Sequence, residues 1–505
     1  MRGFFGVRRG RNDMERDDRL KVENNGSGGK ALKAGIGYTV GNILIRGIAF
    51  LTIPVFSSLL STADYGIYNT FASYVSIVTI ILGLALQASI KNARFDFPEK
   101  LADFCSSLAL LTIVNSLVIS GVVCCFASPL SRVMDMATPW LVVLIMVESF
   151  ANCILYFYNA MLSVQYKYKE YLVISFIYSL SSVALSVVLI IFCFKGAPYM
   201  GRVLGSVIPL LALSAYMLWR IFRAAKPKVS KQYWKYGLKI ALPLVPHQLS
   251  QIILSQFDRI MIKSMVGDSA AGLYSFAFNI ALLLHVITNS TDTAWSPWFF
   301  EQMEAKNYQQ IKKSSNLYML LVTVLSVGLM VISPELVFIM SAGNGEYLPS
   351  KYVVIPIVMS MFFSFIYTLP VGVEYYYKKT GYIALGTTLA AVLNVVLNYI
   401  FIKMTGSYVA AAYTTVVTHF LYYLFHMILA RKIAKRQLFN VGLMAATSLF
   451  VLVFGFVCLA LADYIIVRAV MLLGILAVLA VFVIKKKDEL LAMFGKGRAA
   501  HATRD

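Results

Sequence analysis

The sequence is poor in charged residues, and in acidic residues above all. Charged residues make up 14% of the 505 positions, whereas a soluble domain carries roughly 25%. Hydrophobic residues reach 59%, with a mean hydropathy of +0.73. A chain with so few charges cannot cover a water-facing surface, so the composition excludes a soluble globular protein and indicates a membrane protein.

Cysteine is also scarce. The six cysteines lie in apolar runs, and none forms a CxxC pair or a Cys/His spacing typical of a metal site. We therefore expect no disulfide framework, no metal centre and no cofactor. The connections between apolar runs are short, which leaves no room for a catalytic domain with paired carboxylates. The sequence thus does not predict an enzyme such as a polysaccharide polymerase or a glycosyltransferase.

Long apolar segments are what the sequence has in abundance. A membrane-spanning helix needs about 20 mostly apolar residues. The pattern predicts an all-α polytopic membrane protein with about 14 transmembrane helices. The predicted spans cover residues 34–60, 66–90, 105–128, 138–163, 170–194, 199–222, 237–263, 270–298, 314–340, 350–376, 381–403, 408–430, 439–461 and 464–484.

Basic residues alternate along this series of spans. With the N-terminus placed in the cytoplasm, the cytoplasmic connections hold 21 lysines and arginines and the external connections hold six. This bias predicts that the N- and C-termini are both cytoplasmic. It also accounts for the net charge of +21, because nucleic-acid binding needs a soluble module with interleaved aromatic residues.

The two halves of the chain repeat each other. Gly66 and Tyr68 open the second span, and Gly272 and Tyr274 open the eighth, both at an offset of 206 residues. Both copies follow an odd-numbered span, so the repeat has parallel topology, with a pseudo-two-fold axis along the membrane normal. The predicted divisions are a disordered cytoplasmic tail at 1–32, a six-helix lobe at 33–223, a basic linker at 224–236, a second six-helix lobe at 237–432, an extra helix pair at 433–485 and a cytoplasmic tail at 486–505.

The stretch from Gly237 to Trp298 carries the most informative polar residues. Its two apolar segments keep ionisable residues well inside them: Asp258 and Arg259 in the first, and Asp292 in the second. A charge near the middle of a bilayer costs about 2.5–3.5 kcal/mol, so such residues usually face a partner or a wet cavity.

These charges extend two polar stripes at helical spacing. The first stripe consists of His247, Gln251, Ser255 and Asp258. The second stripe consists of His285, Asn289, Asp292 and Ser296. Two such helices favour a water-filled translocation path. The alternative is that the stripes are hydrogen bonds that hold helices together.

Other spans add polar residues to the candidate path. Asn42 and Arg46 lie on one face of the first span, and Glu148 lies within the fourth. Lys91 ends the second span, where the alternative is a side chain that reaches the membrane interface. Arg46 and Arg259, one in each half, predict a cationic cavity for an anionic head group, since arginine matches phosphate geometry. Asp258 and Asp292 would hold these arginines in place or bind a coupling ion.

Several motifs resemble one known family. They are Ile53–Asn69, Phe257–Ile262 with Ala271–Ser275, Trp295–Pro297, Lys379–Gly381, Leu393–Asn398 and Gly406–Ala412. Their order is similar to that of the bacterial polysaccharide-biosynthesis (lipid-linked oligosaccharide) flippases of the multidrug/oligosaccharidyl-lipid/polysaccharide exporter superfamily, over about residues 33–485.

The resemblance implies a flippase that moves undecaprenyl-diphosphate-linked oligosaccharide by alternating access, for O-antigen, capsule or exopolysaccharide assembly. Asp258-Arg259 matches an Asp-Arg pair of the family, and Arg46 lies where members often hold a basic residue. Implied partners are the lipid-linked substrate, membrane lipids, a polymerase, glycosyltransferases and a coupling ion, H⁺ or Na⁺. A peptidoglycan-precursor flippase and a multidrug/cation antiporter remain the alternatives.

Overall fold

The computed structural model describes residue 35 and residues 37–495, and these residues form helices and short connections without a strand. The all-α class predicted from the sequence is confirmed. The predicted tail at 1–32 lies outside the described residues, as do the last ten residues of the predicted tail at 486–505. The first ten residues of that tail continue the last helix, α19 (Ile465–Gly495).

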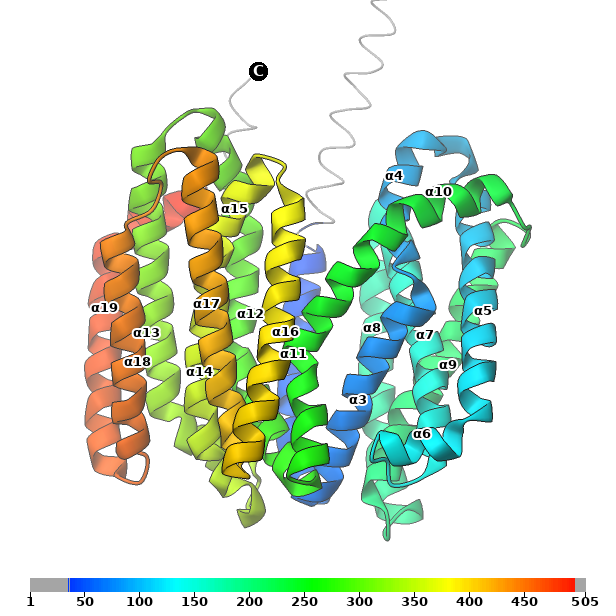
Figure 1. Cartoon of the computed structure of the whole chain (residues 1–505), viewed down its shortest axis with the longest axis horizontal. Helices are drawn as coiled ribbons and strands as arrows, with labels where there is room; N and C mark the ends of the chain where they lie inside the picture. Colours follow the sequence, from blue (N-terminus) through cyan, green and yellow to red (C-terminus); the bar gives the residue numbers. More distant parts are fainter. Residues whose placement is uncertain (1–34, 36, 496–505) are drawn as a thin grey trace, which may run out of the picture.

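The helices fall into a first bundle before the basic linker and a second bundle after it (Figure 1). The first bundle contains the span Gly37–Leu59, which ends in α2 (Ile53–Leu59), and then α3 (Thr62–Gly83), α4 (Ser89–Asp96), α5 (Leu101–Cys125), α6 (Ala127–Val133), α7 (Pro139–Val164), α8 (Tyr168–Val188) and α9 (Pro198–Ala224). The second bundle contains α11 (Val245–Met265), α12 (Asp268–Glu304), α13 (Tyr308–Met340), α14 (Lys351–Ile366), α15 (Thr368–Tyr376), α16 (Thr380–Thr405), α17 (Val409–Ala434), α18 (Val441–Ala460) and α19.

Twelve helices in the described residues are long and apolar enough to cross a membrane, and each overlaps one of the predicted spans. The other two predicted spans, 237–263 and 408–430, appear as the helices α11 and α17, which are not among these twelve. Both pack against other helices of the molecule: α11 against α3, α12 and α16, and α17 against α14 and α16. A polar helix can lie at membrane depth where neighbouring helices cover it.

Several predicted spans have other bounds in the structure, and two of these differences bear on the candidate site. The span predicted at 66–90 is interrupted because Leu84 and Ala85 adopt positive φ angles of 48° and 53°, which end α3. The span predicted at 237–263 begins later, at Val245. Its first residues belong to α10 (Lys231–Ala241), which is followed by a short 3₁₀ turn with Pro243.

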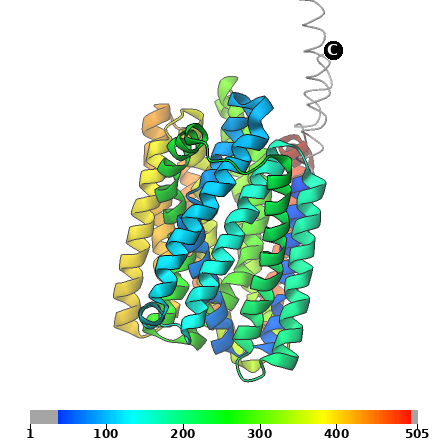
Figure 2. The same ribbon diagram turned by 90° about the vertical axis from the view of Figure 1, so that its right-hand side faces the viewer.

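The axes of the long helices in both bundles are roughly aligned, and successive helices alternate in direction (Figures 1 and 2). α10 crosses one end of the molecule, at the top of Figure 1, and α6 lies at the opposite end. We call these the α10 end and the α6 end. The bundles meet where α3 of the first packs against α11 and α12 of the second. Since α3 and α12 open with the two copies of the repeat, the interface lies on the pseudo-two-fold axis.

At the α6 end the repeated glycines contact each other's helices. A Cβ atom on Gly66 would lie 1.9 Å from the carbonyl oxygen of Asp268. One on Gly272 would lie 1.9 Å from the carbonyl oxygen of Thr62. The relationship is reciprocal, because Thr62 and Asp268 are also 206 residues apart. Both glycines are therefore required for close approach of two backbones, as at small-residue crossings of membrane helices.

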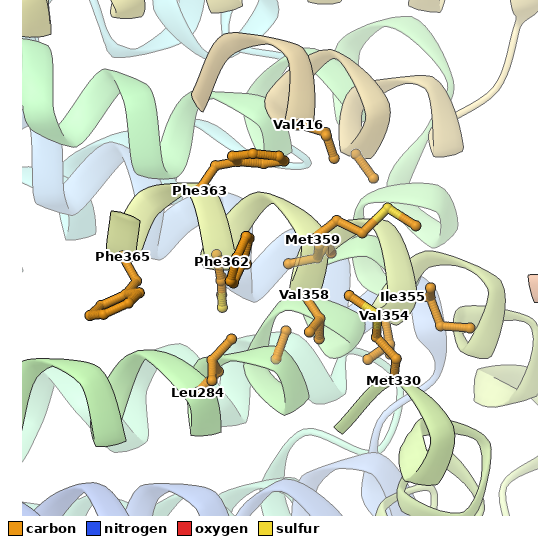
Figure 3. Close-up of a cluster of buried hydrophobic side chains, with 14 of the residues drawn as sticks. Leu284, Met330, Val354, Ile355, Val358, Met359, Phe362, Phe363, Phe365 and Val416 are labelled. Carbon is orange, nitrogen blue, oxygen red and sulfur yellow. The ribbon is translucent and has the colours of Figure 1, made fainter. Parts of the chain in front are cut away.

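The core of the second bundle is built around α14, whose side chains are buried on all sides. In Figure 3, Phe363 lies beside Val416 of α17, while Leu284 of α12 and Met330 of α13 lie on the opposite face. A helix that is hydrophobic all round needs neighbours on every face. α14 thereby fixes the positions of α12 and α17, which carry part of the candidate site.

Candidate functional site

A cavity of about 500 Å³ lies between the two bundles. Its walls come from the first span, α3 and the start of α9 on one side, and from α12 on the other. Most of the wall is apolar, and no Asp or Glu of the described residues lines it. Two arginines do: Arg46 and Arg202. The volume falls in the range of small-molecule sites, about 300–1,000 Å³.

Arg46 is the one member of the predicted set that lines this cavity. It lies 13 residues before the end of its span at Leu59, about 20 Å along a helix at 1.5 Å per residue. The described residues give its side chain no hydrogen bond and no ion pair. His285 of α12 is close enough to interact with it electrostatically. The guanidinium group is therefore available to a ligand in the cavity.

Arg202 was counted with the charges of an external connection, although it lies within the span predicted at 199–222; α9 begins at Pro198 and places it inside the helix. Its Cζ atom lies 3.9 Å from the ring centroid of Phe56 and 4.5 Å from that of Tyr68. Its Nη1 atom donates a hydrogen bond of 2.9 Å to Ser186 Oγ. These contacts hold the guanidinium group in one orientation. The positive end of the α9 dipole adds to its field, which favours an anion.

The pattern that could have revealed Arg202 is modest. Ser206 follows it by one helical turn, and Ser182 and Ser186 are one turn apart on the preceding helix. Arg202 donates to both of those serines, at 3.4 Å and 2.9 Å. A serine face on two consecutive helices indicates a polar seam, but only the fold shows that an arginine belongs to it.

Hydrogen bonds between the bundles close the cavity toward the α6 end. Asn279 Nδ2 donates to Tyr65 OH at 2.8 Å, and both residues line the cavity. Glu346 Oε2 accepts from the backbone N–H of Thr62 at 3.1 Å. Tyr347 OH donates to the carbonyl oxygen of Leu60 at 3.0 Å. Together with the glycine crossing, these contacts separate the cavity from that end of the molecule.

Arg259, predicted to face the cavity together with Arg46, is not among its lining residues. It is only 4% exposed, and its Cζ atom lies 4.4 Å from the ring centroid of Phe278. It donates to the side chain of Gln256 and, at 3.2 Å, to the carbonyl oxygen of Ser255. Tyr65, which does line the cavity, is near enough to interact with it electrostatically.

Asp258 connects four helices of the second bundle. Its carboxylate, 2% exposed, accepts hydrogen bonds from Tyr274 OH at 2.6 Å, Asn398 Nδ2 at 2.6 Å and Thr415 Oγ1 at 3.0 Å. Asn394 Oδ1 in turn accepts from Asn398 at 3.2 Å. In the described part of the chain, no ion pair joins Asp258 to an arginine. The cluster is a closed polar network whose members bond to one another across four helices.

Glu148 and Asp292 lie in different bundles. Glu148 is buried in α7, accepts a hydrogen bond of 3.1 Å from Ser206 Oγ, and interacts electrostatically with Arg202. Asp292 lies in the second half of α12 and accepts from Ser296 Oγ at 3.4 Å. Glu148 therefore stands behind the cavity arginine, whereas Asp292 belongs to the interior of the second bundle.

Two further predicted residues lie at the edges of the site. Asn42 Oδ1 accepts a hydrogen bond of 2.6 Å from Tyr171 OH of α8, which joins the first span to its own bundle. Lys91 is exposed on α4, after the break that ends α3. That position suits an interfacial side chain better than a wall of the cavity.

His247 and Gln251 come together in a second pocket of about 290 Å³, between α3 and α7 of the first bundle and α11 of the second. This pocket lies nearer the α10 end. Gln87 comes just after the end of α3, and His247 lies in the first turn of α11, which follows α10. We call it the amide pocket, after the glutamines Gln87, Gln248 and Gln251 that line it.

Two related helix bundles with a cationic cavity between them define a class of membrane transporter. The family description "Polysaccharide biosynthesis protein" matches residues 31–303, more than half of the chain, so the protein belongs to this family. The family description "MatE" matches residues 243–400. The resemblance inferred from the sequence is thereby confirmed.

Individual relatives are distant. A protein of the Lsg locus of Haemophilus influenzae is 24% identical over 378 residues, which cover 72% of this chain and 90% of that protein. The structure of the lipid II flippase MurJ in an inward closed conformation matches with a TM-score of 0.67 at 16% identity, covering 90% of this chain and all of that one. An inward-facing multidrug resistance MATE transporter matches with a TM-score of 0.57 at 15% identity, covering 79% of this chain and 95% of that one. The two structures share the fold with this protein.

Proposed function

We propose that this protein is a flippase that moves undecaprenyl-diphosphate-linked oligosaccharide across the bacterial plasma membrane for surface polysaccharide assembly. The observation that carries the proposal is the pair of arginines, Arg46 and Arg202, in one cavity whose wall holds no acidic residue in the described part of the chain. Two guanidinium groups suit the two phosphates of a lipid diphosphate, because arginine binds phosphate through paired N–H groups.

The arrangement of the bundles supports alternating access. The hydrogen bonds between the bundles at the α6 end hold that side together, through contacts such as Tyr65–Asn279 and Thr62–Glu346. With both termini cytoplasmic, as the distribution of lysine and arginine predicts, this is the external side. The substrate would enter from the cytoplasmic leaflet and leave when the α6 end opens.

The coupling ion is proposed at two places. Asp258 and its hydrogen-bonded neighbours form a compact oxygen-rich cluster in the second bundle that suits Na⁺. Glu148, next to Arg202, is a carboxyl group that could carry a proton in the first bundle. In either case the ion would act on a helix that lines the cavity, since Asp258 bonds to Tyr274 of α12 and Glu148 bonds to Ser206 of α9.

The test is flipping in cells that lack their own oligosaccharide flippase. The wild-type protein is expected to restore surface polysaccharide, while Arg46→Gln and Arg202→Gln reduce it at least tenfold. Arg132→Gln, which removes an exposed arginine outside the cavity, is the matched control and keeps wild-type function. If both cavity variants work normally at equal expression, the cationic-cavity mechanism is wrong.

A peptidoglycan-precursor flippase is the second candidate, favoured by the structural match to MurJ. Both substrates are lipid diphosphates, and the arginine pair suits either of them. Depletion of the host's own peptidoglycan-precursor flippase separates the two. Rescue of growth by this protein, without restoration of surface polysaccharide in the first strain, would assign it to the second function.

A further inference from the structure

The amide pocket differs in chemistry from the arginine cavity. No charged residue of the described chain lines it. Its polar wall consists of amide, imidazole and hydroxyl groups: Gln87, Gln248, Gln251, His247, Ser76 and Tyr156. An uncharged pocket with many hydrogen-bonding groups has no preference for an anion. It suits a neutral ligand that is rich in hydroxyl and amide groups.

The protein leaves much of this hydrogen-bonding capacity unused. Among the described residues, none forms a side-chain hydrogen bond with Gln87, Gln248 or Gln251. Nδ1 of His247 is buried and also has no partner there. Each glutamine offers two N–H donors and a carbonyl acceptor. Side chains that served only to hold helices together would be bonded to one another, as Thr387 is to Tyr422.

An aromatic ring completes the pocket. Tyr156 of α7 lines it and is 50% exposed, so the ring is accessible from inside the pocket. The face of an aromatic ring is apolar and carries a weak negative charge, so it packs well against the C–H face of a ring-shaped ligand. One ring surrounded by side-chain amides is a combination that recognises the two surfaces of a sugar, its C–H face and its hydroxyl edge.

We propose that the amide pocket binds the sugar part of the substrate, a neutral glycan with hydroxyl or N-acetyl groups. This inference rests on the proposed function, since it assumes that the cargo is a lipid-linked oligosaccharide. The arginine cavity then binds the diphosphate, and the amide pocket selects the glycan. A site that pairs polar groups with its ligand rejects ligands that lack those groups, because the groups would stay unpaired.

The pocket belongs to both bundles. Tyr156 and Gln87 come from the first bundle, and Gln248 and Gln251 come from α11 of the second. A glycan bound to both sides is released when the bundles move apart or slide past each other. The same motion that opens the α6 end would therefore also change the grip on the sugar.

The test compares lipids with and without a glycan. The purified full-length protein, in phosphatidylcholine nanodiscs, is titrated by native mass spectrometry with undecaprenyl diphosphate and with undecaprenyl diphosphate carrying one of three neutral disaccharides. Nanodiscs avoid detergents with sugar head groups. We expect at least one disaccharide lipid to bind tenfold or more tightly than the bare lipid.

The double variant Gln248→Leu/Gln251→Leu preserves side-chain size and removes both amides. It is expected to abolish the tenfold gain and to bind the bare lipid within twofold of wild type. Gln232→Leu, an exposed glutamine on α10, is the control and keeps the gain. Arg46→Gln/Arg202→Gln should weaken binding of both kinds of lipid. A melting temperature within about 2 °C of wild type shows that each variant is folded.

The outcomes separate this inference from the proposed function. Three results would show that the amide pocket is not a sugar site: the glutamine variant keeps the tenfold gain, it weakens the binding of both lipids equally, or no disaccharide increases the affinity of the wild-type protein. In each case, arginine-dependent binding of the bare lipid would still support the flippase. If the wild-type protein does not bind undecaprenyl diphosphate at all, the proposed function itself fails.

Discussion

Gly66 and Gly272 each contact the carbonyl oxygen that lies four residues before the other glycine. A Cβ atom at either position would lie 1.9 Å from that oxygen, so the two helices can cross here only without side chains. The contact is symmetric, because the two glycines occupy the same place in the two halves of the chain. It holds the bundles together at the end where the cavity is closed.

The first prediction concerns this crossing. Gly66→Ala or Gly272→Ala forces the helices apart by about 1.5 Å, the difference between the observed gap and ordinary contact. We expect at least a tenfold loss of flipping and an α6 end that stays open. A membrane-impermeant maleimide applied from outside should then label a cysteine placed at Leu282, a cavity residue.

The control for the crossing is Gly121→Ala, because a Cβ atom at Gly121 meets nothing within 4 Å. This variant should flip normally and leave the cysteine at Leu282 unlabelled. If Gly66→Ala behaves like the control in both measurements, the crossing is packing without a role in opening.

The second prediction separates charge from geometry at Arg202. Lysine keeps the positive charge but cannot stack between Phe56 and Tyr68 or offer paired N–H groups. We expect Arg202→Lys to retain part of the flipping activity and Arg202→Gln to retain almost none. Equal activity of the two variants in the cell assay would mean that charge at this position is unimportant.

The third prediction concerns stability at Asp258. Asp258→Ala leaves Tyr274 OH and one N–H of Asn398 without an acceptor in a buried site, while Thr415 keeps the carbonyl oxygen of Ala411. Each unsatisfied donor costs about 1–3 kcal/mol, so the variant should lose on the order of 3 kcal/mol of stability. Thermal unfolding of the purified protein measures the loss.

Asp258→Asn is the conservative comparison, since it keeps an acceptor oxygen and the same shape. It should melt between wild type and Asp258→Ala. An Ala variant that melts like wild type would show that the network carries no stability.

The fourth prediction concerns the connection between α18 and α19. Asp463 accepts hydrogen bonds from Lys351 Nζ at 2.5 Å and Tyr352 OH at 2.9 Å, and these partners lower the pKa of its carboxyl group. A lowered pKa stabilises the fold above the ordinary carboxyl pKa of about 3.9, and this contribution is lost as the pH falls through the lower value.

Asp463 is fully exposed, so the effect is small. The melting temperature of Asp463→Asn should fall below that of wild type by no more than about 1 °C at pH 7. The difference should shrink as the pH falls below about 4, and it should vanish in about 1 M salt. A difference that stays constant between about pH 7 and pH 3 would contradict the assignment to the ionised carboxyl group.

Hydrophobic periodicity was enough to predict the helices, because a bilayer imposes one length and one composition on every span. It did not predict the end of α3 before Leu84 or the start of α11 at Val245. At both places the helix is interrupted although the sequence stays apolar. It also did not single out Arg202, because a basic residue in the first turn of the span predicted at 199–222 is typical of a side chain that reaches the membrane interface.

The candidate site was predicted in part. Polar spacing put His247 and Gln251 on one helical face, and the structure places them in one pocket. The same spacing put Asp258 on that face, yet its carboxylate is enclosed by Tyr274, Asn398 and Thr415. Periodicity tells which residues share a face, but the partners across that face come from other helices. Asn398 and Thr415 are more than 100 residues away, and spacing along one helix cannot identify them.

By itself, the sequence determined the helical membrane fold, the repeat and its parallel topology, because these depend on local hydropathy and on a motif that recurs at a fixed offset. The tertiary structure decided which charges meet. Arg46 and Arg202 come from the first and sixth spans. They line one cavity because α3 packs against α12 and encloses it. That packing depends on Gly66 and Gly272, which have no Cβ atom. The need for glycine at these positions is apparent only from the position of the opposite backbone.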